Sequence, residues 1–400
     1  MRTTSGQDSI VKIAELKASV ISEVDAHREQ LNELSLRIHA NPELGFQETK
    51  AAAWLTEYLA GHGFSIEAGI CGLPTAFRAG YGTGKPAVAI LAEYDALPQL
   101  GHACGHNLIA ASAAGAGLAC KPVIDQLGGS IFIIGTPAEE VYGGKVVMAE
   151  RGAFDGIDIA MMAHPGTHDT AATWALACQP LEVEFLGQAA HAAAHPEAGI
   201  NALEAMVQSF NAINSLRQHI RDRARIHGII TDGGGAPNVV PAHSAGTFIV
   251  RAPDDKYLDE LKQRVIDCFS GAATATGARL EYRWGDVRYA TLRPNLTLAR
   301  LFKENMESLG RKVSLTDPES AFGSTDMGNV SQLVPGIHPE VAIAPEGVAV
   351  HSPEFALAAA SDAGSRGLLD AAKALAMTVA DLASSPETVS KIKEEFRQGG

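Results

Sequence analysis

The chain has 400 residues, of which 46% are hydrophobic and 20% are charged, a balance typical of a globular protein with a sizeable core, and at this length two domains are expected. The formal net charge of −14 argues against a nucleic-acid or anionic-membrane partner, because such partners require clustered lysine and arginine. Five scattered cysteines favour reduced thiols over a disulfide framework. The first twenty residues lack the apolar stretch and cleavage site of a signal sequence, so we expect a cytoplasmic protein.

The first 178 residues alternate between continuous apolar runs of strand length and segments with apolar residues at helical spacing. This pattern predicts helices at 13–39, 49–60, 108–120 and 145–154, and strands at 86–92, 129–134 and 157–162. Strand, loop and helix thus repeat three times, which is typical of a mostly parallel sheet with helices on both faces. In such sheets functional groups gather at the carboxyl ends of the strands.

The pattern changes near Cys178, where polar and apolar residues begin to alternate as in a half-exposed strand. We predict strands at 181–186, 225–231, 245–251 and 279–284, with helices at 201–220 and 255–269. The order βαββαβ is that of a ferredoxin-like α+β domain. We place this domain at 179–293, inserted within a first α/β domain formed by 1–178 and 294–400. The first domain resumes with helices at 296–309, 357–382 and 386–396 and a strand at 340–344.

The sequence GHACGHN at residues 101–107 places a thiol and an imidazole two residues apart in a glycine-rich loop. In an extended loop the side chains of residues i and i+2 lie on the same side, so Cys104 and His106 can share one metal site. The small residues beside them let the backbone approach an ion closely. Such a pair is also typical of an ordinary buried thiol beside a surface histidine, and the metal hypothesis therefore needs ligands from other strand ends.

Glu139 and Glu140 follow the strand at 129–134, and Pro137 stiffens the connection. Neighbouring extended residues point to opposite sides, so one carboxylate can bind a metal while the other faces the substrate. In a di-metal hydrolase a metal-bound water gives a proton to a nearby carboxylate, which later passes it to the leaving amine. We therefore assign Glu139 as the general base and Glu140 as a ligand; the alternative is a solvated acidic turn.

Two histidines, His164 and His351, follow further predicted strands, although each alone is equally typical of a core or turn histidine. Five donors then fall at the same edge of one predicted sheet, and such a set fits two first-row ions that share a bridging ligand. They are Cys104, His106, Glu140, His164 and His351. Asp95, just past the strand at 86–92, can hold a ligating imidazole without touching the metal, or can be an ordinary turn residue.

Nine motifs along the chain carry a family resemblance. They are NPELGFQE (41–48), LAEYDALP (91–98), GHACGHN (101–107), TPAEE (136–140), AHPG (163–166), GQAAHAAAHPEAGINAL (187–203), PNVVP (237–241), GSTDMGNVS (323–331) and HSPEF (351–355). In this order the chain resembles the aminoacylase, carboxypeptidase and dipeptidase family of metal-dependent amidohydrolases. Within that family it is most similar to the branch with a Cys-Gly-His ligand pair, and there to the aminoacylase-1-like dipeptidases and the aminobenzoyl-glutamate hydrolases.

The resemblance implies the same five ligands, Glu139 as the general base, and a homodimer. It further implies that His191 reaches into the partner's active site to stabilise an oxyanion, and that Asn238 and Arg251 bind the substrate carbonyl or carboxylate. Gly323 and Ser324 could offer further donors beside Arg251. The broader family has a histidine ligand two residues before the aspartate that matches Asp95. In this chain Glu93 stands at that position. Because the Cys-Gly-His branch also lacks the histidine, we do not count Glu93 as a ligand.

We expect a hydrolase of amide bonds in small N-acyl amino acids or dipeptides, with two divalent ions, a metal-bound hydroxide as nucleophile and the inserted domain closing over the substrate. A thiolate ligand favours zinc, whereas an oxygen-rich site would admit manganese or cobalt. One alternative is a metal-dependent deaminase that displaces an amine from an aromatic ring. Another is a metal-binding or small-molecule-binding protein without enzymatic activity, but such a protein would not need the base Glu139.

Overall fold

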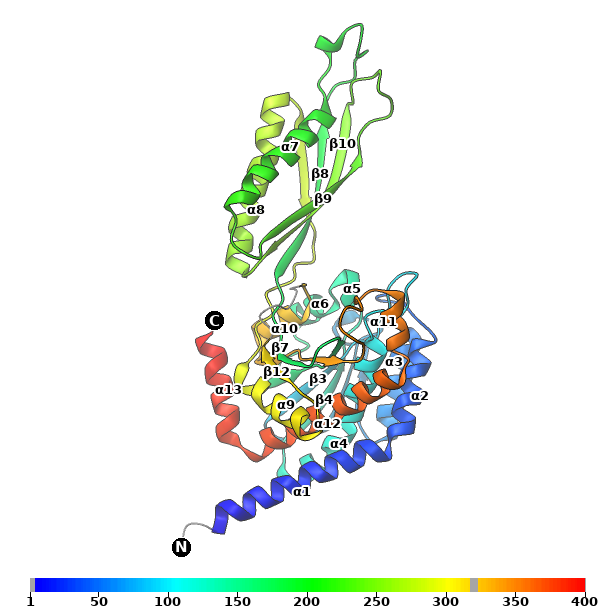
Figure 1. Ribbon diagram of the computed structural model, residues 1–400, viewed down its shortest axis with the longest axis vertical. Coiled ribbons are helices and arrows are strands. Elements are labelled where there is room, and N and C mark those ends of the chain that lie inside the picture. The colour runs from blue at the N-terminus through cyan, green and yellow to red at the C-terminus, as the bar shows by residue number, and fades with distance from the viewer. Residues whose placement is uncertain (1–3, 317–322, 400) are drawn as a thin grey trace. The chain divides into compact units, whose positions relative to one another are not determined.

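The computed structural model describes residues 4–316 and 323–399 (Figure 1). Contacts within the chain separate two compact units, each with its own hydrophobic core. The first unit comprises the described residues within 1–174, 292–321 and 329–400, and the second those within 175–291 and 322–328.

The first unit is built on a six-stranded sheet. In sheet order its strands are β1 (Ser65–Ala68), β2 (Phe77–Gly82), β4 (Ser130–Gly135), β3 (Ala87–Ala92), β5 (Ile159–Met161) and β13 (Gly336–Ile337). The four strands from β4 to β13 are parallel, β2 pairs antiparallel with β4, and β1 pairs antiparallel with β2. Every residue of β3 is buried, as expected for a central strand covered on both faces. The predicted α/β class is confirmed, but the apolar pattern does not indicate β1 and β2, because Gly80 and Gly82 interrupt the second of them.

A second sheet of four short strands lies in the same unit. Its order is β12 (Ser314–Thr316), β7 (Thr170–Ala172), β14 (Glu340–Ala342) and β6 (His164–Gly166). Strand β6 pairs in parallel with β14, with His164 opposite Glu340. The pairing fixes the backbone on both sides of His164, so this histidine projects from a regular strand end and not from a free loop.

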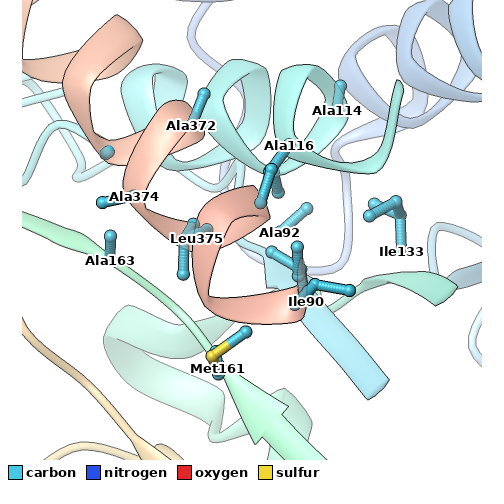
Figure 2. Close-up of a cluster of buried hydrophobic side chains, with 14 of the residues drawn as sticks. Ile90, Ala92, Ala114, Ala116, Ile133, Met161, Ala163, Ala372, Ala374 and Leu375 are labelled. Carbon is cyan, nitrogen blue, oxygen red and sulfur yellow. The ribbon is translucent and has the colours of Figure 1, made fainter. Parts of the chain in front are cut away.

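Helices pack around these sheets. Outside residues 175–291 they are α1 (Thr4–Ala26), α2 (Arg28–His39), α3 (Thr49–Gly61), α4 (His106–Leu127), α5 (Glu139–Tyr142), α6 (Gly144–Glu150), α9 (Leu296–Ser308), α10 (Met327–Leu333), α11 (Pro353–Ala358), α12 (Asp362–Ser384) and α13 (Pro386–Gln398), with a 3₁₀ turn at Ile70–Gly72. Helix α4 packs on β3, β4 and α12, and Figure 2 shows alanines of α4 and α12 beside Ile90, Ile133 and Met161. A Cβ atom at Gly117 would lie 2.7 Å from Ile133, so small residues set this close approach. The length and composition of α4 would also suit a membrane span, but most of the helix is buried in the core.

Two predicted helices are interrupted in the structure. The segment 13–39 is divided at His27, whose backbone leaves helical geometry and whose Nδ1 lies 3.0 Å from the carbonyl oxygen of Glu23. The segment 357–382 is divided at Ser361, where the hydroxyl accepts a hydrogen bond from the N–H of Gly364 and starts α12. Apolar spacing continues across both breaks, which is why spacing alone predicts single helices.

The second unit has the predicted βαββαβ order. Its strands in sheet order are β11 (Arg279–Trp284), β8 (Ala177–Leu186), β10 (His243–Ala252) and β9 (Arg225–Asp232), all antiparallel, and its helices are α7 (Ala202–Leu216) and α8 (Asp255–Thr276), with 3₁₀ turns at Pro196–Ala198 and Arg217–His219. Along β8, Leu181, Val183 and Phe185 are buried while the residues between them are exposed. One face of the sheet therefore carries the two helices, and the other is free of them.

Candidate metal centre and active site

The loop after β3 brings a thiol and an imidazole together through a sharp turn. Gly105 has φ of 78° and stands immediately before α4, whose first residue is His106. A Cβ atom at Gly105 would lie 2.9 Å from Pro165, so glycine is required both by the left-handed backbone and by the close approach of β6. The extended loop predicted here is wrong. Cys104 and His106 nevertheless lie together, because the turn and the helix start direct both side chains to one place.

All five predicted ligands lie in one cluster within the first unit. They are supplied by the loop after β3, by α4, by α5 after β4, by β6 and by the loop after β14: Cys104, His106, Glu140, His164 and His351. The Sγ atom of Cys104 is 3.4 Å from Nε2 of His164, and Nε2 of His351 is 3.3 Å from Oε1 of Glu140. Potential ligand atoms of Cys104, His106 and His164 lie within 4.8 Å of one another. The same holds for Cys104, Glu140 and His351. Together these residues would hold divalent ions if such ions were bound.

Hydrogen bonds at Nδ1 orient the buried imidazole of His106 and the half-buried imidazole of His164. Nδ1 of His106 lies 2.9 Å from Oδ1 of Asp95, and Nδ1 of His164 lies 2.7 Å from the carbonyl oxygen of Pro165. Each ring thus keeps its proton on Nδ1 and directs Nε2 into the cluster, as metal-binding histidines do. Asp95 also accepts a hydrogen bond of 3.0 Å from the N–H of Glu140, and so connects two candidate ligands.

Cys104 and His106 are buried within the cluster, Glu140 and His164 are half-buried and His351 is exposed, and anionic side chains surround His106. Burial raises the pKa of the Cys104 thiol well above its usual value. Burial opposes the charged form of His106, but Asp95 and the other anionic groups around it outweigh this effect and raise the pKa of His106 well above its usual value. Nε2 of His106 is buried and has no hydrogen-bond partner among residues 4–316 and 323–399. Three nitrogens, one sulfur and one carboxylate in such surroundings fit divalent first-row ions.

Glu139 and Glu140 lie in a different backbone conformation from the one predicted. They form the first turn of the short helix α5, which follows Ala138 with φ of 60°. Successive helical residues point about 100° apart, not to opposite sides, and both carboxylates lie within 4.8 Å of His106. Both carboxylates therefore lie beside His106, and Glu140 also groups with Cys104 and His351.

Several buried charged residues around the cluster have no signal in the sequence. Glu48 is completely buried, and its carboxylate accepts hydrogen bonds from the N–H of Ala138 and the hydroxyl of Thr75. Burial raises the pKa of Glu48 to about 7. Since Ala138 begins the turn that carries Glu139, Glu48 positions the candidate base from ninety residues away in the sequence. Glu93 and Lys145 are equally buried and form an ion pair.

The remaining predicted site residues lie in the second unit, in two separate places. Arg251 donates a hydrogen bond of 2.6 Å from Nη1 to the hydroxyl of Ser324, and the carbonyl oxygen of Gly323 accepts one from the N–H of Leu176. His191 and Asn238 belong to two loops that pair with each other, since the N–H of Ala192 donates to the carbonyl oxygen of Asn238 over 3.0 Å. These loops adjoin the start of β10, whereas Arg251 is near its end.

Comparisons with known proteins agree with this organisation. Residues 180–275 match the family model described as "Peptidase dimerisation domain" of M20 peptidases. The chain is 37% identical to the Xaa-Arg dipeptidase of Mus musculus over 98% of its own length and 94% of the relative's. It is 34% identical to a subunit of the p-aminobenzoyl-glutamate hydrolase of Escherichia coli, over 72% and 64% of the two chains. A dinuclear metal-binding M20 peptidase from Bacillus subtilis has the same fold, with a TM-score of 0.68 and 21% identity over 90% of this chain and 99% of its own.

The family resemblance in the nine motifs is thus confirmed by an identity that extends through both units. M20 peptidases are metal-dependent, and the cluster of five donors in the first unit fits divalent ions. With a dipeptidase matched over almost its whole length and a peptidase dimerisation domain in the inserted unit, the chain belongs to the M20 family of metallopeptidases.

Proposed function

We propose that this protein hydrolyses the amide bond of small N-acyl amino acids or dipeptides. The observation that carries the proposal is the cluster of five metal-binding side chains with a further carboxylate, Glu139, beside it. The named activities of the relatives, a dipeptidase and an aminobenzoyl-glutamate hydrolase, both cleave a bond between an acyl group and an amino acid nitrogen.

The ligand cluster and the base would divide the chemistry between them. Bound divalent ions would polarise the substrate carbonyl and acidify a water molecule. Glu139 would accept the proton of that water and deliver it to the leaving amine. Asp95 would keep His106 in the tautomer that directs Nε2 to the ion, and Arg251 would hold the substrate carboxylate through its two-pronged guanidinium. The thiolate supports zinc as the native ion, with manganese or cobalt as substitutes.

The second unit supports a homodimer in which the two protomers complete each active site. Along β10 the eight residue steps from His243 to Arg251 correspond to about 27 Å. The loops of His191 and Asn238 adjoin the His243 end, since the N–H of Gly187 bonds to Ala242 there. A fully extended dipeptide spans only about 7 Å. Arg251 and His191 of one chain therefore cannot contact the same small substrate. We propose that His191 and Asn238 contact the substrate bound in the partner's active site.

A complementation experiment tests this shared site. The variant His191→Ala should lose about 10²-fold to 10³-fold in kcat, the usual loss when one oxyanion donor is removed, and should still dimerise in sedimentation measurements. Co-expression with Glu139→Gln should restore activity to about one quarter of the wild-type level, because half of the dimers are mixed and each mixed dimer has one intact site. If the mixed preparation is no more active than its inactive parents, His191 does not act across the dimer.

A substrate panel tests the reaction itself. N-acetyl and N-benzoyl amino acids, aminobenzoyl-glutamate and β-alanyl dipeptides should each be offered to zinc-, manganese- and cobalt-loaded protein, with free amino acid measured as the product. Amide cleavage in at least one class is expected. Release of ammonia from an aromatic amine, with all amides left intact, would favour the deaminase instead.

A further inference from the structure

Glu93 and Lys145 form an ion pair inside the first unit, directly against the ligand cluster. Glu93 follows the last residue of β3, Lys145 belongs to α6, and both side chains are completely shielded from solvent. The ammonium group of Lys145 donates a short hydrogen bond to Oε1 of Glu93. Burying two charges is costly, and a buried ion pair is rarely a net source of stability. A functional role therefore explains the pair better than a contribution to stability does.

The second oxygen of this carboxylate points at the nitrogen that should bind metal. Oε2 of Glu93 lies 3.3 Å from Nε2 of His106. Neither atom has a hydrogen-bond partner among the residues that the structure describes. Because Asp95 holds the proton of His106 on Nδ1, Nε2 offers a lone pair in the neutral ring. Two electron-rich atoms thus face each other in the neutral form of the ring, and either a proton on Nε2 or a metal ion between them would satisfy both.

The spacing of the two atoms agrees with a shared ion. Zinc lies about 2.1 Å from both imidazole nitrogen and carboxylate oxygen, so two such donors at a tetrahedral angle are roughly 3.4 Å apart. The observed 3.3 Å matches this value. Lys145 occupies Oε1 and leaves Oε2 directed at the cluster, and it also favours the ionised carboxylate, which burial alone would oppose.

We propose that Glu93 is a further ligand of the metal centre, bound through Oε2, and that Lys145 is a positioning residue that holds the carboxylate by Oε1. This assignment replaces the exclusion of Glu93 from the ligand set, which compared only residue types at one position. It rests on the metal centre of the proposed function. A harder oxygen ligand beside the thiolate would also broaden the range of ions that the site accepts.

Metal binding by three variants tests the proposal. Glu93→Gln removes the carboxylate charge but leaves the buried ammonium of Lys145 without its partner, which can destabilise the fold. The double variant Glu93→Gln/Lys145→Met removes both charges and avoids this problem. Asp158→Asn is the matched control, because Asp158 is a mostly buried carboxylate of the same unit, paired with Lys85 and Lys393 and not among the candidate metal-binding groups. Folding of each variant is verified by thermal unfolding followed by circular dichroism.

The readouts are the affinity for zinc in competition with a chromophoric chelator and the visible spectrum of the cobalt-loaded protein, which responds to the number of ligands. Both Glu93 variants should bind zinc at least about 100-fold more weakly, beyond the usual effect of residues that only support a ligand, and their cobalt spectra should change. The control should match the wild type. An unchanged cobalt spectrum in the folded double variant would overturn the assignment. Wild-type protein that binds no metal would overturn the metal centre too, whereas metal-loaded protein that cleaves no amide would overturn only the substrate class.

Discussion

Removal of divalent ions should abolish amide hydrolysis, with a loss of at least about 10⁴-fold, because an uncoordinated water has a pKa of about 15.7 and is a poor nucleophile at neutral pH. The measurement is the rate of amino acid release before and after dialysis against a strong chelator. Zinc, manganese and cobalt are then returned one at a time. At least one ion should restore most of the activity, and the ratio of metal to protein at full activity should approach two.

The reloading step should depend on pH in a defined direction. Burial raises the pKa of the Cys104 thiol and anionic neighbours raise the pKa of His106, so in the metal-free protein these two side chains hold their protons up to higher pH than free side chains would. A metal ion must displace these protons, and its apparent affinity should therefore fall as the pH falls. Metal uptake in weakly buffered solution should release protons, which a pH indicator can count. Full activity in chelated protein whose metal content is verified to be zero would contradict the metal-dependent reaction.

The fold could be predicted from sequence where one physical pattern dominates. The continuous apolar run at 86–92 predicts a strand buried on both faces, and β3 is such a strand. The alternation from Leu181 predicts a half-exposed strand, and β8 is buried at every second residue in that segment. Helix ends are harder to predict from the sequence, because His27 and Ser361 interrupt helices through local hydrogen bonds that leave the apolar spacing intact.

The candidate site followed from topology, since donors at the carboxyl ends of neighbouring strands must meet at one edge. Cys104, Glu140 and His164 are brought together in this way whatever the exact distances between them. The position of Glu48 does not follow from strand order, because its role depends on one hydrogen bond from the N–H of Ala138. The pairing of Glu93 with Lys145 does not follow from strand order either, because no spacing in the sequence distinguishes a buried ion pair from two surface charges.

Glu139→Gln should lower kcat by about 10²-fold to 10⁴-fold, the range that general acid–base groups contribute, while leaving the metal in place. The amide keeps the size of the carboxylate but cannot accept a proton from water or return it to the amine. Metal content should stay at the wild-type level, because Glu139 adjoins the cluster and Glu140 is the ligand proposed from this turn. Glu140→Gln is the contrasting variant, and it should lose metal affinity together with activity.

The metal contents of Glu139→Gln and Glu140→Gln distinguish a general base from a metal ligand. Glu150→Gln, at an exposed position in the same segment, controls for a simple change of surface charge and should behave as the wild type. Substrate KM should change little in Glu139→Gln, since the base acts on water and not on the bound substrate. Wild-type kcat in the metal-loaded Glu139→Gln protein would show that another group takes the proton. Loss of metal from that variant would instead place Glu139 among the ligands, so the two possible roles predict opposite results in metal analysis.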